Sequence, residues 1–221
     1  MTAGKPHAEP SALAVDFYFG VGSRYSYLAA TQLRALEAET GARFNWLAVD
    51  STRLIAARGG DPFAAPNGAG QYDWSYRRKD AEAWADLYGV PFREPRGRIA
   101  LDSDLLSLAC TAARRLGAAE TYAQLLFRAV FVEDLPAIDR ALCIERAGEA
   151  GLDRASFTVA LDDAGTTAER QRVMHKAAQQ GAFGVPTSIV GDRMFWGNDR
   201  LVLLRNHLLD RTGAASRGHP T

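Results

Sequence analysis

The segment Ser23-Arg24-Tyr25-Ser26 lies where a strand pattern gives way to a helical one, so Ser23 is a natural N-cap. Unpaired N–H groups in the first turn of a helix give that end about half a positive charge. To lower the pKa of a thiol from about 8.5 to about 6.5, a site must favour the thiolate over the thiol by roughly 2.7 kcal/mol. A charge-assisted hydrogen bond of about 1.5–3 kcal/mol, with up to about 1 kcal/mol from the helix dipole, can supply this. Ser23 could therefore hold a thiolate, or serve only as a helix cap.

The thiolate would have to come from another molecule. Two serines cannot form a disulfide, so dithiol exchange through Ser23 and Ser26 is excluded. The only cysteines, Cys110 and Cys143, lie far apart inside helical patterns, and we expect both to be buried apolar residues. No His, Cys, Asp or Glu cluster has the spacing of metal ligands, so no metal is expected. Arg24 would add positive charge to the site or point to solvent.

The first part of the chain predicts a strand, a helix and a parallel strand around Ser23. Apolar and other residues alternate from position 13 to 19, and Gly20 and Gly22 then end the strand. Leucines at helical spacing follow from Tyr25 until Gly41, and an apolar strand covers 44–49. This is a βαβ unit with parallel strands.

The rest of the chain predicts a helical block and a second half of the sheet. Residues 51–71 are rich in Gly and Pro and indicate a mobile loop, and the helices expected after it cover 72–88, 101–116, 119–132, 137–150 and 166–180. Two strands, 184–190 and 193–196, and a last helix follow. We predict an α/β, thioredoxin-like fold (βαβ…ββα) with a large all-helical insertion. Its predicted division is a discontinuous thioredoxin-like domain (12–52 and 175–210), a helical insertion (53–174) and flexible tails (1–11 and 211–221).

The composition is that of an ordinary globular domain. The chain has 221 residues, 47% of them hydrophobic and 24% charged, and its formal net charge is zero. A chain without net charge has no broad electrostatic field to attract nucleic acid or anionic lipid, so neither partner is expected. No apolar run is long enough to span a membrane, and the N-terminus lacks the apolar core of a secretory signal. These features predict a cytoplasmic enzyme.

Several segments, in the same order over about residues 13 to 209, resemble one family. They are Phe17-Tyr-Phe-x-x-x-Ser-x-Tyr-Ser-Tyr-Leu-Ala29, Tyr88-Gly-Val-Pro-Phe92, Gly184-Val-Pro-Thr187 and Phe195-Trp-Gly-Asn-Asp-Arg200. The family is the 2-hydroxychromene-2-carboxylate isomerases, relatives of the kappa-class glutathione transferases. The chain departs from the family at Arg24, usually proline, at Gly20, usually acidic, and around 53–60 and 71–75.

The resemblance implies a DsbA-like helical insertion, a homodimer and glutathione as cofactor. It implies that Ser23 binds the thiolate and that the Val185–Pro186 bond is cis, which lets the Val185 backbone pair with the cysteinyl part of glutathione. The alternative is a trans proline at the start of an edge strand. Asp199 and Arg200 open the last helix, where they would bind the γ-glutamyl end. The alternatives are a helix cap for Asp199 and a surface ion pair for Arg200.

The implied function is glutathione-dependent cis/trans isomerisation of a small aromatic 2-hydroxychromene-2-carboxylate-like compound in aromatic catabolism. Tyr76 matches a tyrosine of the family pattern, and Arg24 and Arg53 are predicted with it to bind substrate. Arg58, Arg96 and Arg98 are further candidates for the substrate carboxylate. Two other functions stay open: a kappa-type glutathione transferase or peroxidase, and a non-catalytic thioredoxin-fold binding protein.

Overall fold

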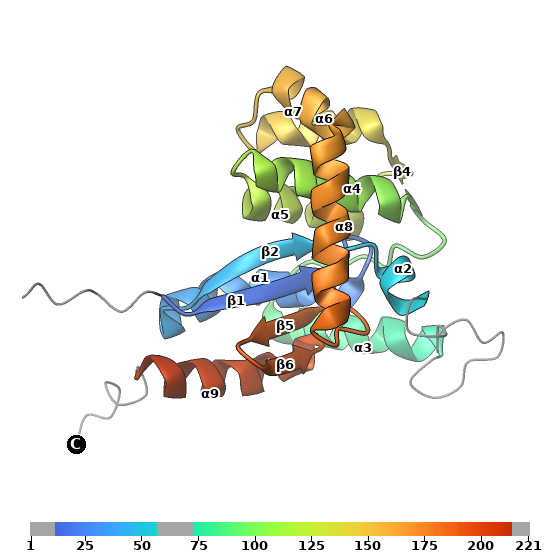
Figure 1. Ribbon diagram of the computed structural model, residues 1–221. Helices are drawn as coiled ribbons and strands as arrows, with labels where there is room; N and C mark the ends of the chain where they lie inside the picture. The colour runs from blue at the N-terminus through green and yellow to red at the C-terminus, as the bar shows by residue number, and fades with distance from the viewer. Residues whose placement is uncertain (1–11, 57–72, 214–221) are drawn as a thin grey trace, which may run out of the picture.

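A computed structural model describes residues 12–56 and 73–213 of the chain (Figure 1). Its main sheet has four strands in the order β2-β1-β5-β6. The parallel pair consists of β1 (Ala14–Phe19) and β2 (Arg43–Ala48). The antiparallel half adds β5 (Thr187–Val190) beside β1 and β6 (Arg193–Trp196) at the edge. The predicted thioredoxin-like α/β fold, βαβ at one end of the chain and ββα at the other, is confirmed.

The helix α1 (Arg24–Thr40) connects β1 to β2 and begins and ends at residues the sequence identifies. Ser23 is its N-cap, with the side-chain oxygen accepting a hydrogen bond from the Ser26 N–H. Gly41 follows its last turn with φ 72°, and its N–H donates to the Glu37 carbonyl. Such a left-handed cap favours glycine, because a Cβ is costly at positive φ.

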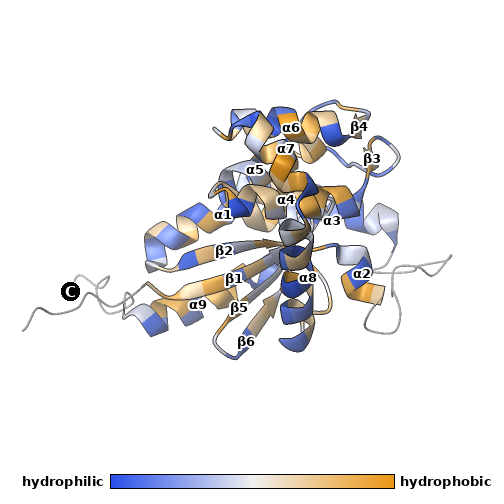
Figure 2. Ribbon diagram, turned by 45° about the horizontal axis from the view of Figure 1, so that its top comes forward, coloured by the Kyte–Doolittle hydropathy of each residue, from blue (hydrophilic) through white to orange (hydrophobic). Residues whose placement is uncertain are grey.

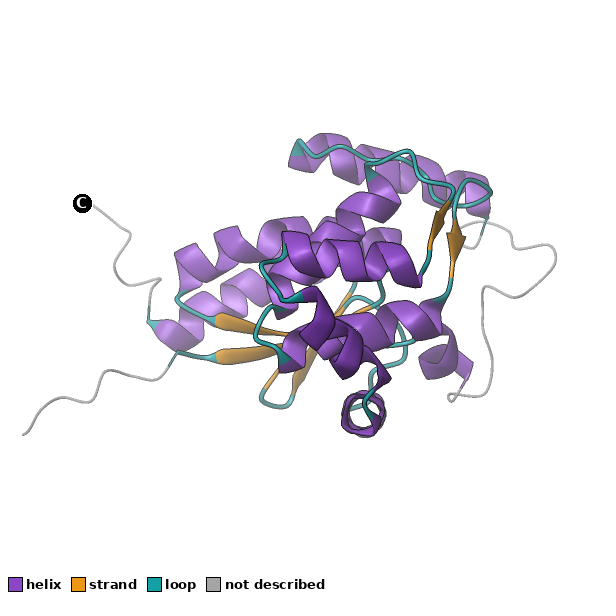
Figure 3. Ribbon diagram, turned by 90° about the horizontal axis from the view of Figure 1, so that it is seen from above, coloured by secondary structure: helices purple, strands orange, loops and turns teal. Residues whose placement is uncertain are grey.

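The remaining helices surround the sheet (Figure 1). They are α2 (Ser51–Ala56), α3 (Trp74–Tyr88), α4 (Ser103–Arg115), α5 (Ala119–Phe131), α6 (Arg140–Glu149), α7 (Arg154–Asp162), α8 (Ala164–Gln179) and α9 (Leu201–Thr212). In Figure 1, α4 to α7 lie above the sheet, α8 crosses it, and α3 and α9 lie below it. A 3₁₀ turn, η2 (Asn198–Arg200), leads into α9, and two short parallel strands, β3 (Ala100–Leu101) and β4 (Ala137–Ile138), pair beside the helical layer (Figures 2 and 3).

The alternation predicted for β1 places its side chains in two different cores. Phe17 and Phe19 stack at 5.6 Å between ring centroids in the larger core, which also holds α1, α4 and α5. Tyr18 points to the other face, where it packs in a second core that includes Ala177 of α8 and donates a 2.6 Å hydrogen bond to Gln180. The visible side of α8 is largely hydrophilic (Figure 2). The sheet is therefore covered on both faces.

The structure corrects some predicted boundaries. The helix α2 occupies the start of the segment expected to be a 51–71 loop, and 57–72 lie outside the described residues. The helix α7 has no counterpart among the predicted helices. The helix α6 begins at Arg140 rather than 137, because β4 precedes it and Asp139 caps it by accepting from the Leu142 N–H. Helices this short have too few turns to show a clear hydrophobic period.

The helical block consists of α4 to α7, and α8 runs from it across the sheet (Figure 1). Because α8 continues unbroken through position 174, the proposed division at 174/175 falls inside one helix. Within the described ranges, none of the helices has the length and apolar character needed to cross a bilayer. No group of three His, Cys, Asp or Glu residues there could hold a metal ion.

Candidate active site

The turn between β1 and α1 presents the Ser23 hydroxyl at the first turn of a long helix. The Ser23 N–H donates to the Gly20 carbonyl at 3.0 Å, which fixes the turn. The Ser23 oxygen accepts the Ser26 N–H at 3.2 Å, and the residue is half-buried. Because the oxygen is used as an acceptor, its O–H can still donate to a bound anion.

Gly20 brings two other segments against this turn. A Cβ built on Gly20 would lie 3.2 Å from Ser51 Oγ and 3.4 Å from Val185 Cγ2. The acidic residue usual in the resembled family would therefore require Ser51 or Val185 to shift. The close approach joins the end of β1, the start of α2 and the segment before β5 in one place. A small pocket opens beside it, lined by Gly20, Val21, Gly22, Val49, Ser51, Ser103, Leu106 and Ser107.

The Val185–Pro186 peptide bond is cis, so the trans alternative is wrong. The segment is held on both sides: Thr187 Oγ1 donates to the Gly184 carbonyl at 2.7 Å, and the Gly197 N–H donates to the Pro186 carbonyl at 2.9 Å. Val185 itself is only partly buried. It contacts the second core, beside the Ser23 turn.

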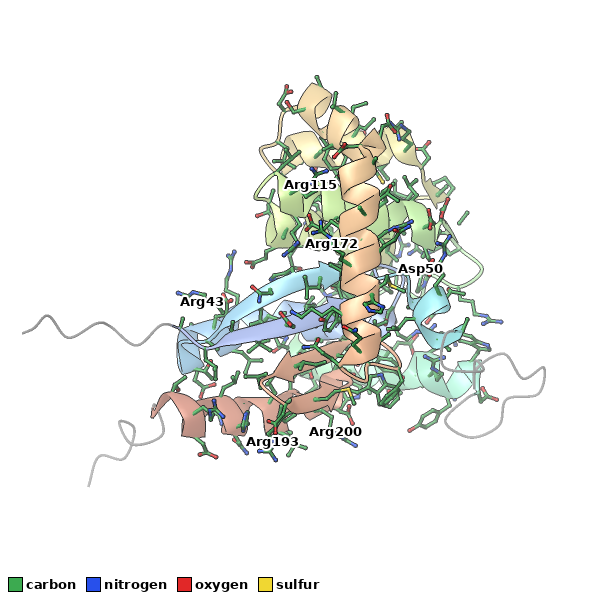
Figure 4. All side chains as sticks on the ribbon, in the orientation of Figure 1. Arg43, Asp50, Arg115, Arg172, Arg193 and Arg200 are labelled. Atoms are coloured by element: carbon green, nitrogen blue, oxygen red, sulfur yellow. The ribbon has the colours of Figure 1, made fainter. Side chains whose placement is uncertain are left out.

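Asp199 and Arg200 lie in η2, directly before α9. Their side chains form an ion pair with each other at 2.5 Å, and both are about half exposed. Figure 4 shows Arg200 near β6 and α9, with Asp50 at the start of α2. The neighbouring Asn198 is 3% exposed, and its Nδ2 has no hydrogen-bond partner in the described part of the chain. Asn198 belongs to the Phe195-Trp-Gly-Asn-Asp-Arg200 segment that carries the family resemblance, and it is the first residue of η2.

Arg24 does not point to solvent, which corrects one of the two alternatives for it. Its side chain is 8% exposed and forms a 2.7 Å ion pair with Glu94, on the segment after α3. The guanidinium also lies 5.0 Å from the ring centroid of Trp74. The charge is thus placed beside the Ser23 turn but neutralised in part by Glu94.

The other predicted substrate-binding residues are less well placed to meet a carboxylate. Arg53 forms ion pairs with Asp50 at 3.2 Å and Asp104 at 2.9 Å, and Tyr76 is 54% exposed on α3. Arg98 donates to backbone carbonyls, including that of Glu133 at 3.0 Å. Arg58 lies outside the described residues.

The nearby tyrosines and the two cysteines are poor acids and nucleophiles at neutral pH. Burial and the hydrogen bond to Asp80 raise the pKa of Tyr25 to about 12. Burial raises the pKa of Tyr27 to about 12, and its hydroxyl donates to the Pro91 carbonyl. Burial raises the pKa of Cys143 to about 11 and that of Cys110 well above its ordinary value. Both cysteines are therefore mostly protonated at neutral pH.

The mixed sheet, the cis-proline segment and a serine at the start of α1 define a thioredoxin-fold protein without its own redox cysteines. A family model for the DsbA-like thioredoxin domain matches residues 14–209. A 2-hydroxychromene-2-carboxylate isomerase from Pseudomonas putida is 30% identical over 88% of this chain and 93% of its own length. The chain belongs to the DsbA-like thioredoxin domain family and, within it, to the 2-hydroxychromene-2-carboxylate isomerase family.

Solved structures agree with this placement. A structure of a 2-hydroxychromene-2-carboxylate isomerase aligns with a TM-score of 0.77 and 30% identity, covering 92% of this chain and 98% of its own. The cytosolic disulfide reductase DsbM from Pseudomonas aeruginosa, solved with GSH, aligns with a TM-score of 0.60 and 21% identity, covering 89% and 99%. The second likeness shows the shared fold, and the first supports an isomerase activity.

Proposed function

We propose that the protein is a glutathione-dependent cis/trans isomerase of 2-hydroxychromene-2-carboxylate-like aromatic compounds. The observation that carries this is the half-buried Ser23 hydroxyl at the first turn of α1, beside the cis Val185–Pro186 segment. The names of the relatives supply the substrate class. The two cysteines of the chain are buried, so they do not compete for the role of nucleophile.

The residues present fit glutathione. When bound, glutathione supplies the thiolate for addition to, and departure from, a conjugated carbon of the substrate. Ser23 donates its O–H to the thiolate sulfur, and the first turn of α1 adds its positive end. The Val185 backbone pairs with the cysteinyl part of the peptide. Asp199 accepts from the α-ammonium of the γ-glutamyl end, with Arg200 and the opening of the last helix receiving its carboxylate.

The Asp199 assignment predicts weaker cofactor binding in Asp199→Asn. Loss of one charge-assisted hydrogen bond at a partly exposed position should raise the glutathione Kd about 10-fold. Isothermal titration calorimetry measures this directly. Asp192→Asn, on the exposed β5–β6 turn, removes an equal charge at the other end of β6 and should leave the Kd unchanged. Equal affinity in all three proteins would contradict the role of Asp199.

The direct test of the function is an isomerisation assay on 2-hydroxychromene-2-carboxylate with and without glutathione. We expect turnover that requires glutathione and saturates with its concentration. Turnover unaffected by its removal would contradict the proposal. Conjugation of a halonitroaromatic without isomerisation would indicate a kappa-type transferase. No glutathione binding at millimolar concentration in calorimetry would indicate a non-catalytic binding protein.

A homodimer in the cytoplasm is part of the same proposal, and its basis is the family resemblance together with the sequence composition. Light scattering after gel filtration should give twice the mass of one 24.0 kDa chain. The mass of a single chain would contradict the dimer without bearing on the chemistry at Ser23.

A further inference from the structure

Three arginines surround one tryptophan next to the Ser23 turn. The guanidinium carbons of Arg96, Arg77 and Arg24 lie 3.8, 4.8 and 5.0 Å from the ring centroid of Trp74. The indole is 37% exposed, so the group reaches the surface. We call Trp74 with these three arginines the Trp74 cluster. At such distances the ring face attracts a guanidinium group through a cation–π interaction.

The cluster is linked to the active site through the backbone and through Glu94. Arg24 follows Ser23 directly, so their Cα atoms are about 3.8 Å apart. Glu94 Oε1 accepts a hydrogen bond from the Arg24 guanidinium at 2.7 Å and another from the backbone N–H of Arg96 at 3.1 Å. Further along the same segment, Leu101 Cδ1 lies 3.1 Å from the position of a Cβ on Gly22. The cluster therefore borders the turn that presents Ser23.

Arg96 carries the charge in the cluster that no acidic side chain in the described part of the chain pairs with. Stacking uses the face of a guanidinium and leaves the N–H groups at its edge available. No acidic side chain in the described ranges pairs with the Arg96 guanidinium, which is exposed, while Arg24 Nε is buried without a hydrogen-bond partner there. Glu94 forms an ion pair with Arg24 of the cluster. Asp80 accepts a hydrogen bond from the Tyr25 hydroxyl.

We propose that the Trp74 cluster is the specificity element that binds the carboxylate of the aromatic substrate. Arg96 is its exposed donor, Arg77 and the buried Arg24 supply further positive charge, and Trp74 holds the arginines in place. This inference rests on the proposed function of the Ser23 site. It selects Arg24 and Arg96 from the arginines that the sequence predicts for substrate binding, because Arg53 already has two acidic partners. The resembled family usually has proline at position 24, so Arg24 is a departure of this chain from that pattern.

The test compares Arg96→Met and Trp74→Leu with two matched controls. The controls are Arg93→Met and Arg78→Met. Arg93 lies on the same segment as Arg96 and pairs with Asp134, and Arg78 lies on the same helix as Trp74 and pairs with Glu82. Neither arginine belongs to the cluster. The measurements are the KM for 2-hydroxychromene-2-carboxylate, the glutathione Kd, and calorimetric binding of 2-naphthoate and its neutral amide without glutathione.

We expect Arg96→Met to raise the KM and the 2-naphthoate Kd about 10-fold, with Trp74→Leu acting in the same direction. The glutathione Kd and the controls should not change, and the wild type should prefer 2-naphthoate to the amide. An unchanged KM and 2-naphthoate Kd would overturn the inference while leaving Ser23 in place. Weakened glutathione binding alone would also overturn it, by assigning the cluster to a carboxylate of the peptide. Failure of the function itself would appear separately, as glutathione-independent turnover in the wild type.

Discussion

Replacement of Ser23 by alanine is expected to lower kcat/KM for 2-hydroxychromene-2-carboxylate about 10- to 100-fold. The reason is the loss of one charge-assisted hydrogen bond to the thiolate, about 1.5–3 kcal/mol. The pH–rate profile should change with it. Because the thiolate is the reactive form, activity falls as pH decreases through the thiol pKa. Without the hydroxyl that pKa rises, so the acidic limb moves to higher pH.

Two variants separate this effect from loss of a helix cap. Ser23 caps α1, so alanine also costs about 0.5–2 kcal/mol of stability. Asp153→Ala removes the cap of α7, which accepts from the Ser156 N–H far along the chain, and should lose stability without losing activity. Ser23→Thr keeps a hydroxyl and should restore most of the activity. Full activity in Ser23→Ala would refute the assigned role.

Glu94→Gln is expected to destabilise the fold by about 3 kcal/mol. The Arg24 and Glu94 side chains are only 8% and 15% exposed, and removal of one charge leaves the other buried and uncompensated. Gln keeps the shape of Glu, so the measurement isolates the charge. Urea denaturation at constant m value should show the change as a lower midpoint.

The double variant Arg24→Met/Glu94→Met removes both charges of the buried pair, whereas Glu94→Gln removes only one. Replacement of a buried pair by apolar residues is often close to neutral, so most of the lost stability should return. The surface pair of Arg34 and Glu120 is the matched control: Arg34 is 85% exposed, and Glu120→Gln should cost less than about 0.5 kcal/mol. A Glu94→Gln midpoint equal to that of Glu120→Gln would show that the Arg24 charge is well solvated.

The position of Ser23 could be predicted because every signal for it is local. The alternation that makes β1, the glycines that end it and the serine that caps α1 all lie within about ten consecutive positions. Each is set by backbone preference or by the hydrophobic period. The thioredoxin-like plan followed from the βαβ unit and the late ββα segment, because such connections have few arrangements.

The surroundings of Arg24 could not be predicted in the same way. Its partners, Glu94 and Trp74, are far along the chain, and no local pattern indicates that they meet. The sequence predicts Arg53 as a carboxylate-binding residue, but in the structure Arg53 forms ion pairs with Asp50 and Asp104. Pairing of this kind depends on tertiary packing, which decides whether a charged side chain is available to a ligand.

A structure of the protein with bound glutathione is the most direct test of the proposed mechanism, in which Ser23 holds the glutathione thiolate. We predict the glutathione sulfur within hydrogen-bonding distance of Ser23 Oγ, with the cysteinyl backbone along Val185 and the γ-glutamyl end at Asp199. A glutathione molecule bound with its sulfur away from Ser23 would contradict the mechanism.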